Sequence, residues 1–337
     1  MENIDLMDPN VLTQGPKPVD LTNGTQASAV TTLIKSILKT PTSDGISYAI
    51  GGRFVYRITP TEVINAGSGG GTFQKPILKT GVTECDGEDI VYYKSKLYYF
   101  YNHSGSAGDI GQYDLNITSD GDWGSTVPIN YEALQDAPHQ AINGGDDVVY
   151  FTNGRYIGTI SSPLAGLTLD TEALDFWENS VTVSVTWNNN RVLVAVNRPD
   201  IAGAINQSAV YTWNGVSSSW EGDPIEVSGR IGALYTKNGV TFVWWQDATD
   251  TNGFNFGYIS GLQLMPVKRF KGSLPLFYQV GEYKGFICWV SDGKVYLWGA
   301  KEPGIAVTIS QYCSAVHATV GGIGAPFGTL IIASYSP

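Results

Sequence analysis

The stretch that decides the fold is Asp89–Tyr101, which reads DIVYYKSKLYYFY. Two runs of β-branched and aromatic residues, Ile90–Tyr93 and Leu97–Tyr101, flank the short polar break Lys94–Lys96. Such residues suit a pleated, half-buried surface, and two such runs around a polar break predict a β-hairpin. Both runs are nearly continuous rather than alternating, which indicates strands covered on both faces. A buried helix is the competing interpretation, and the aromatic and β-branched content disfavours it.

The same pattern recurs along the chain. Asp147–Ile160 matches the first stretch, Asp147-Val-Val-Tyr-Phe against Asp89-Ile-Val-Tyr-Tyr, and its Asn153-Gly154 pair predicts a type I′ turn. Further candidate hairpins are Ser47–Thr59, Val185–Val196, Ala233–Trp245, Val280–Val290 and Ala318–Tyr335. Third strands are expected at Ile110–Leu115, Ala209–Trp213, Phe256–Ile259 and Lys294–Trp298. The turns of these hairpins are spaced by roughly 35 to 60 residues, the period of propeller blades. We therefore predict an all-β fold, a β-propeller of seven four-stranded blades.

The ends of the chain suggest how such a ring closes. The sequence stops just past the last hairpin, so the last blade lacks its outer strands, and the first 40 residues are the expected donor of a closing strand. Ala29–Thr40 fits a short helix or a strand, and a first blade favours the strand. Residues 1–27 are polar and rich in turn formers, which predicts an extended N-terminal arm. Residues 28–337 are predicted to form a single propeller domain.

Composition excludes several classes of function. The net charge is −11 and the pI about 4.7, so binding of a nucleic-acid backbone by counterion release is disfavoured. The three cysteines form no CxxC pair, which argues against a zinc site and against a disulfide framework. The N-terminus has no secretory signal pattern, and no apolar run reaches the length of a membrane span. We expect no metal and no cofactor.

Paired carboxylates are the strongest candidates for chemistry. Glu88-Asp89 and Asp146-Asp147 stand just before a strand in what the repeats predict to be equivalent positions. A general acid and a base or nucleophile are the carboxylate pair that glycosidases use. Asp89 and Asp147 are therefore the candidate catalytic residues. Asp is also favoured in turns and at strand ends, and this structural interpretation is preferred, so no catalytic residue is assigned.

Two tryptophans lie in polar loops, Trp123 in DGDWGS and Trp220 in SSSWEG. Exposed loop aromatics can stack on sugar faces, which makes these residues candidates for carbohydrate binding. Core packing explains most other tryptophans. The loops Asp120–Asp122 and Asp247–Gly253 loosely resemble calcium-binding loops, but neither has the required ligand spacing, and ordinary acidic turns are favoured.

The overall texture resembles β-propeller structural proteins of tailed bacteriophage virions, with few charges, many Gly and Asn turns and long polar loops such as Asn102–Asp114. That resemblance implies a non-enzymatic component of a tail, nozzle or tail tip in the virion. Its partners would be other virion proteins and copies of itself, with the arm at residues 1–27 contacting a neighbouring subunit. The alternative is a carbohydrate-binding or glycoside-hydrolysing propeller, extracellular and able to bind a host-surface glycan. An intracellular scaffold is a third, weaker interpretation.

Overall fold

The computed structural model describes residues 4–5, 13–14, 33–38, 45–52, 54–58, 63–65, 85–103, 107–114, 133–161, 168–199, 205–299, 308–314, 319–327 and 330–335. Within these ranges the regular elements are β-strands and one short 3-10 helix, η3 (Phe277–Gln279). None of the described helices could span a membrane. The chain divides into two compact units: the first takes residues 1–74, 119–125 and 278–337, and the second residues 75–118 and 126–277.

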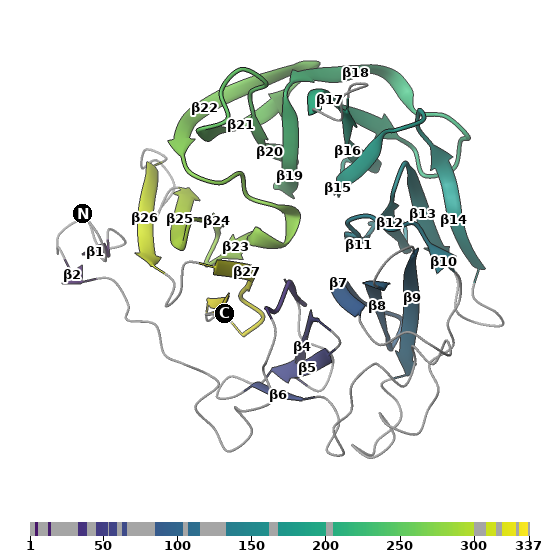
Figure 1. Ribbon diagram of the computed structural model, residues 1–337, viewed down its shortest axis with the longest axis horizontal. Helices are drawn as coiled ribbons and strands as arrows, with labels where there is room; N and C mark the ends of the chain where they lie inside the picture. The colour runs from purple at the N-terminus through teal and green to yellow at the C-terminus, as the bar shows by residue number, and fades with distance from the viewer. Residues whose placement is uncertain are drawn as a thin grey trace. The chain divides into compact units, whose positions relative to one another are not determined.

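The second unit holds four antiparallel sheets of four strands each (Figure 1). The strands of the first sheet are β7 (Cys85–Tyr93), β8 (Lys96–His103), β9 (Ala107–Asp114) and β10 (Ala133–Leu134). The next has β11 (Ala141–Asn143), β12 (Val148–Asn153), β13 (Tyr156–Ser161) and β14 (Thr168–Asp175). Then come β15 (Val181–Asn188), β16 (Arg191–Pro199), β17 (Ile205–Trp213) and β18 (Glu221–Ser228). The fourth has β19 (Arg230–Lys237), β20 (Val240–Gln246), β21 (Gly253–Ser260) and β22 (Gln263–Lys271).

The first unit contains strands from both ends of the chain. One four-stranded sheet has β3 (Ser36–Ile37), β4 (Ser47–Gly51), β5 (Phe54–Ile58) and β6 (Val63–Asn65). Another has β23 (Val280–Tyr283), β24 (Phe286–Ser291), β25 (Lys294–Gly299) and β26 (Thr308–Ser314). Two pairs complete the unit, β27 (Thr319–Gly324) with β28 (Ile331–Tyr335), and β1 (Ile4–Asp5) with β2 (Thr13–Gln14).

The seven predicted hairpins are confirmed as antiparallel strand pairs. Their assumed equivalence is wrong in one respect. Asp89–Tyr101 forms β7 and β8, at one end of the strand order of its sheet, whereas Asp147–Ile160 forms the two central strands β12 and β13. The strand that precedes β12 is β11, which has only three residues and gives no recognisable pattern in the sequence. Asp89 and Asp147 therefore do not occupy matching positions in their sheets.

Turn chemistry explains where the hairpins reverse. Lys94 and Ser95 both have positive φ, 47° and 63°, and they form the two-residue turn between β7 and β8. Positive φ at both central residues is the mark of a type I′ turn. The turn predicted at Asn153-Gly154 is wrong in both position and type. Asn153 pairs with Tyr156, so the turn is Gly154-Arg155, and positive φ at Gly154 alone (61°) makes it type II′ rather than type I′.

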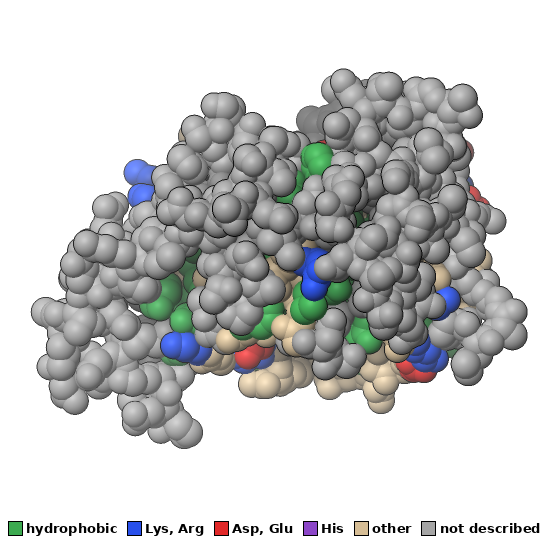
Figure 2. Space-filling view, turned by 90° about the horizontal axis from the view of Figure 1, so that it is seen from below, with side chains coloured by type: hydrophobic (Ala, Val, Ile, Leu, Met, Phe, Trp, Pro, Cys, Tyr) green, Lys and Arg blue, Asp and Glu red, His purple; other side chains and the backbone are tan. Residues whose placement is uncertain are grey.

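Large aromatic side chains fill the core of the second unit. Those that are fully buried there are Tyr98, Tyr99, Phe100, Tyr101, Tyr150, Phe151, Tyr211, Trp213, Trp244, Phe254 and Phe256. Phe100 lies against Phe151 of the next sheet with ring centroids 5.1 Å apart. The aromatic side chains of the β7–β8 hairpin thus pack in the core between neighbouring sheets. On the face in Figure 2 the described hydrophobic side chains reach the surface in small patches, beside charged side chains of both signs.

Within the first unit the two ends of the chain meet. The backbone N–H of Gly322 in β27 donates to the carbonyl of Ile34, just before β3, at 2.9 Å. β3 itself pairs with β4, and the β27–β28 pair includes no other described strand. The closing strand, the closed ring and the count of seven blades therefore stay predictions. So do the arm at 1–27, of which β1 and β2 are described, and the single domain over 28–337.

Candidate functional site

Asp89 joins two sheets of the second unit. The residue lies in β7, and its side chain is buried. One carboxylate oxygen accepts a hydrogen bond from the N–H of Ile90 at 2.8 Å. The other accepts from the N–H of Ala141, in β11 of the next sheet, at 2.7 Å. The two backbone hydrogen bonds stabilise the negative charge of the buried carboxylate, and the carboxylate in turn provides an acceptor for both N–H groups.

Asp147 has entirely different surroundings. It lies in the turn before β12 with φ of 64°, and it is exposed. Its carboxylate forms an ion pair with Lys94 Nζ at 2.5 Å, and its carbonyl oxygen accepts a hydrogen bond from the Tyr93 hydroxyl at 2.5 Å. The hydrogen bond to Asp147 raises the pKa of Lys94. The two candidate carboxylates are therefore one buried link and one surface ion pair, and their part in any hydrolysis stays an untested prediction.

The link made by Asp89 recurs with other residue types. Gln140 Oε1, just before β11, accepts from Ser184 Oγ and from the N–H of Val185 in β15, both at 2.8 Å. Asn197 in β16 accepts from the N–H of Ile231 in β19 at 2.9 Å and donates to its carbonyl at 3.0 Å. Each of these buried polar side chains thus bonds to the backbone of the first strand of the following sheet.

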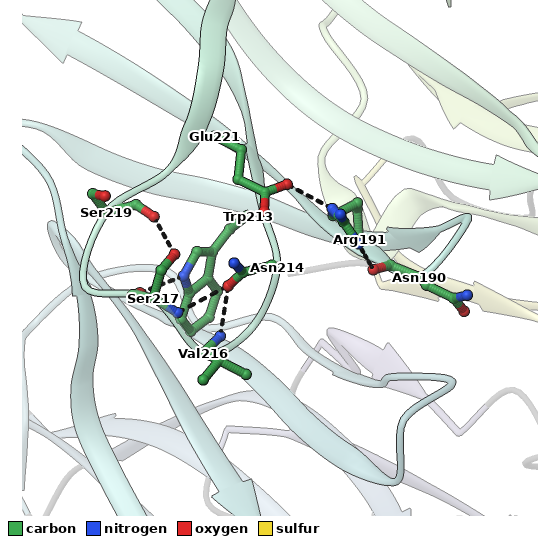
Figure 3. Close-up of polar contacts among 8 residues, drawn as sticks. All are labelled: Asn190, Arg191, Trp213, Asn214, Val216, Ser217, Ser219 and Glu221. Atoms are coloured by element: carbon green, nitrogen blue, oxygen red, sulfur yellow. Dashed lines mark hydrogen bonds and ion pairs between the residues drawn. The ribbon is translucent and has the colours of Figure 1, made fainter.

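Trp220 ends the loop between β17 and β18, while Trp123 lies outside the described residues. Figure 3 shows the contacts that shape this loop. The Asn214 side-chain oxygen accepts from the N–H groups of Val216 (2.9 Å) and Ser217 (2.8 Å). Trp213 Nε1 donates to the carbonyl of Ser217 at 2.7 Å. An Asx turn braced by an indole fixes the approach to Trp220, because Asn readily bonds to the backbone that follows it.

Trp220 belongs to a cluster that we call the aromatic–arginine patch, made of Phe176, Trp177, Arg198, Tyr211, Trp220 and Glu226. Its ring stacks on Phe176, with centroids 5.6 Å apart and an interplanar angle of 8°. The rings of Trp177 and Tyr211 each lie 4.9 Å from it. Phe176 and Tyr211 are buried, so they anchor the two tryptophans to the core between the β11–β14 and β15–β18 sheets.

Trp177 is the exposed aromatic residue of the patch, and the sequence reasoning overlooked it. It follows β14, and 45% of its surface is exposed. The guanidinium of Arg198 lies 4.4 Å from the centre of its ring, within cation–π range. The signal in the sequence is the pair Phe176-Trp177 directly before the polar turn Glu178-Asn179, an aromatic residue at the end of a strand rather than inside one.

Arg198 is held from several sides. Its Nη2 donates to the Tyr211 hydroxyl and lies 3.4 Å from Glu226 Oε1. No described residue accepts a hydrogen bond from its buried Nε. This Nε is therefore a buried donor that the described residues leave unsatisfied. Arg carries a rigid fork of donors, so fixing it in place creates a directional site for an acceptor.

Burial raises the pKa of Tyr211 to about 12, while the positive charge of Arg198 acts in the opposite direction. The tyrosine hydroxyl thus stays protonated at neutral pH. Glu226 is the single carboxylate of the patch and is paired with Arg198. Glycoside hydrolysis needs two carboxyl groups, so the described patch can bind a flat ring and a hydrogen-bond acceptor but lacks an acid–base pair.

The carboxylates of the acidic loop Asp247–Gly253 are engaged in hydrogen bonds and an ion pair within the protein. Asp250 accepts from the N–H of Asn252 at 3.1 Å and pairs with Arg269, and these two interactions, in that order, lower its pKa. Asp247 accepts from the Asn255 side chain at 2.8 Å. No group of three or more His, Cys, Asp or Glu suited to a metal ion occurs among the described residues. The loop Asp120–Asp122 lies outside them.

No known protein family matches the sequence, and no curated protein matches it. Solved structures do resemble it. A putative 6-phosphogluconolactonase from Bacteroides uniformis has a TM-score of 0.54 at 8% identity, covering 88% of this chain and 87% of its own. Extracellular domains 1-2 of Drosophila Semaphorin 1a reach 0.51 at 10% identity, covering 90% and 85%. The Dos1 propeller reaches 0.51 at 10% identity, covering 89% of each chain.

At such identities the likeness shows the fold alone. The chain is an all-β protein with a β-propeller fold, as the hairpin repeats predict. The similar structures range from a putative enzyme to extracellular domains, so the shared scaffold does not indicate one function. Function must be argued from the site.

Proposed function

We propose that this chain is a non-enzymatic binding and assembly protein that acts through protein–protein contacts. The observation that carries the proposal is the aromatic–arginine patch, in which a half-exposed Trp177 lies under a fixed Arg198. Trp, Tyr and Arg are the residue types that dominate the binding energy of protein interfaces. The patch also lacks a second carboxylate, which supports binding rather than hydrolysis.

We place this function in the virion of a tailed bacteriophage, as a tail, nozzle or adhesion component. Support for that setting comes from the resemblance in composition and loop texture. The partners would be other virion proteins and copies of the same chain. An acidic surface suits this setting, because it does not bind the phosphate backbone of packaged DNA.

Incorporation into particles tests the proposal. Particles purified from the source are labelled with an antibody against this chain and viewed by immunogold electron microscopy, and the label is expected on the tail. Trp177→Ala is then compared with Val216→Ala, an exposed apolar residue outside the patch. Truncating a hot-spot aromatic costs about 2 kcal/mol or more, or about thirtyfold in affinity, so Trp177→Ala should deplete the chain from particles. Unlabelled particles, or equal incorporation of both variants, would contradict the proposal.

The second candidate function is carbohydrate binding, favoured by the two tryptophans of the patch. Trp177 and Trp220 present aromatic rings beside a cationic donor, an arrangement that suits the apolar face and hydroxyls of a sugar. A glycan screen with hydrolysis monitored separates the two functions. Glycan binding that disappears in Trp177→Ala would favour the carbohydrate function. Hydrolysis lost in both Asp89→Asn and Asp147→Asn would revive the catalytic carboxylates.

A further inference from the structure

The outermost strands of three sheets in the second unit are strongly charged, with β22 basic and both β14 and β18 acidic. β14, β18 and β22 each stand last in the strand order of their sheet, and Figure 1 shows them along the outside of this unit. β22 contains Lys268, Arg269 and Lys271 and no acidic residue, a formal charge of +3. This basic segment stands out in a chain whose net charge is −11.

β22 and the turn before it also expose apolar side chains. Leu262, Met265 and Val267 are 66%, 39% and 41% exposed. Three of the seven exposed large hydrophobic side chains of the described residues thus fall within six consecutive positions. Single exposed hydrophobic residues need no explanation, but a cluster rimmed by charge marks an interaction surface.

β14 offers the matching charge with the fewest ion pairs, because Glu221 and Glu226 of β18 are already paired with Arg191 and Arg198. It contains Asp170, Glu172 and Asp175 and neither Lys nor Arg, a formal charge of −3. Asp175 is paired with Arg155, whereas no described Lys or Arg forms an ion pair with Asp170 or Glu172. On β22, Arg269 is paired with Asp250, and no described carboxylate pairs with Lys268 or Lys271. Asp170 accepts a hydrogen bond from the N–H of Glu172 at 2.9 Å, and Lys268 lies over the ring of Phe270. No described ion pair neutralises the charges of Asp170, Glu172, Lys268 or Lys271, so two acidic groups on one strand and two basic groups on the other can pair with a partner.

On this basis we propose that β22 of one copy of the chain binds β14 of a second copy. Lys268 and Lys271 would face Asp170 and Glu172, and the exposed apolar residues of β22 would be covered by the contact. The inference deepens the proposed assembly function and rests on it for its setting. Complementary charge supplies orientation and register, while the buried apolar area supplies affinity.

The contact is expected to use side chains rather than a shared hydrogen-bond ladder. Pro266 has no N–H to donate, and a bulge between Phe256 and Gly257 leaves Val267 out of register in the β21–β22 pair. Proline, lysine and a bulge are the devices by which natural edge strands avoid pairing with other strands. They do not explain three exposed apolar side chains, which a purely protected edge would omit.

Two different surfaces on each copy make the contact head-to-tail. Such heterologous contacts generate a ring when the rotation closes and an open filament when it does not. Either product would place several copies around or along one axis, as an assembly component requires.

Charge exchange tests the contact. Self-association of the purified chain is followed by sedimentation velocity across the micromolar range, at about 50 and about 500 mM salt. Wild type is expected to associate, more weakly at high salt. K268E/K271E and D170K/E172K should each weaken association about tenfold or more, because like charges then face each other. Mixing the two variants should restore it, since each β14 again meets a β22 of opposite charge. K284E/K294E, at exposed lysines of the first unit, is the matched control.

Several results would overturn the inference. A monomeric wild type would do so, as would unchanged association of either β-strand variant or failure of the mixture to recover. Loss of association in K268E/K271E alone would show that β22 binds an occupant other than β14. The proposed function is judged separately, by labelling of particles and by Trp177→Ala. A monomeric chain that still enters particles would refute this contact and leave the assembly function in place.

Discussion

Asp89→Asn and Asp147→Asn are matched substitutions at the two positions that the sequence pairs and the structure separates. Both remove one negative charge and keep the size of the side chain. The two carboxylate oxygens of Asp89 accept hydrogen bonds from the N–H groups of Ile90 and Ala141 inside the protein. The carboxylate of Asp147 forms an ion pair with Lys94 at the surface.

The expected magnitude follows from these contacts. Hydrogen bonds to charged groups contribute about 1.5 to 3 kcal/mol each, and a buried donor left without a partner costs its full desolvation. Asparagine keeps one oxygen and turns an NH₂ group toward the second donor, so Asp89→Asn should lose one such bond, about 2 to 3 kcal/mol. Asp147→Asn should leave stability nearly unchanged, because the pair with Lys94 is exposed and screened by solvent.

Urea unfolding followed by tryptophan fluorescence measures both variants, and a change of midpoint at constant slope reports a change of stability. Hydrogen exchange at the Ala141 amide gives a second, local readout, since that amide loses its acceptor in Asp89→Asn. Equal midpoints for the two variants would refute the assignment of Asp89 as a link between sheets. So would full protection of the Ala141 amide in Asp89→Asn.

Three further predictions concern turns and a tyrosine. Ser95→Gly should raise stability by about 1 kcal/mol in urea unfolding, because Ser95 has φ of 63° and glycine adopts that conformation without strain. Gly154→Ala should lower it by about 2 kcal/mol or more, because a Cβ there would overlap Oε1 of Gln135 and φ is 61°. In a difference titration of wild type against Tyr211→Phe, the phenolate absorbance should appear near pH 12. Because that pKa is raised on folding, the contribution of Tyr211 to stability is intact below about pH 10 and is lost between about pH 10 and 12, a loss absent in Tyr211→Phe.

The hairpins could be predicted from the sequence because their strands are long and their turns are marked. Runs such as Leu97–Tyr101 bury side chains on both faces, and positive-φ turns such as Asn238-Gly239 use residues that tolerate that conformation. The grouping of hairpins into sheets was harder. β10 and β11 have two and three residues, and strands this short carry no periodicity from which their sheet could be assigned.

Only part of the candidate site could be predicted from the sequence. Trp220 stands out because it interrupts a polar loop. Arg198 and Trp177 carry no local signal of their proximity, since one lies near the end of β16 and the other follows β14 of the preceding sheet. Only the packing of two sheets brings the guanidinium over the indole. The same applies to Gln140 and Asn197, whose links to the next sheet are long-range hydrogen bonds between segments without shared sequence pattern.

Hydrogen bonds fix the backbone on both sides of Trp177, and this rigidity helps to explain why the side chain is exposed. Phe176 N–H donates to the carbonyl of Arg155, and Ser180 N–H donates to that of Trp177, both at 3.1 Å. Thr182 then bonds to the carbonyl of Gly154 through both its N–H (2.7 Å) and its hydroxyl (2.8 Å). A large aromatic side chain exposed from a fixed segment forgoes hydrophobic stabilisation that burial would supply. A partner that covers it recovers that energy and orders little else, since the segment is already held in place. Rigid exposure of Trp177 is therefore better explained by binding than by folding.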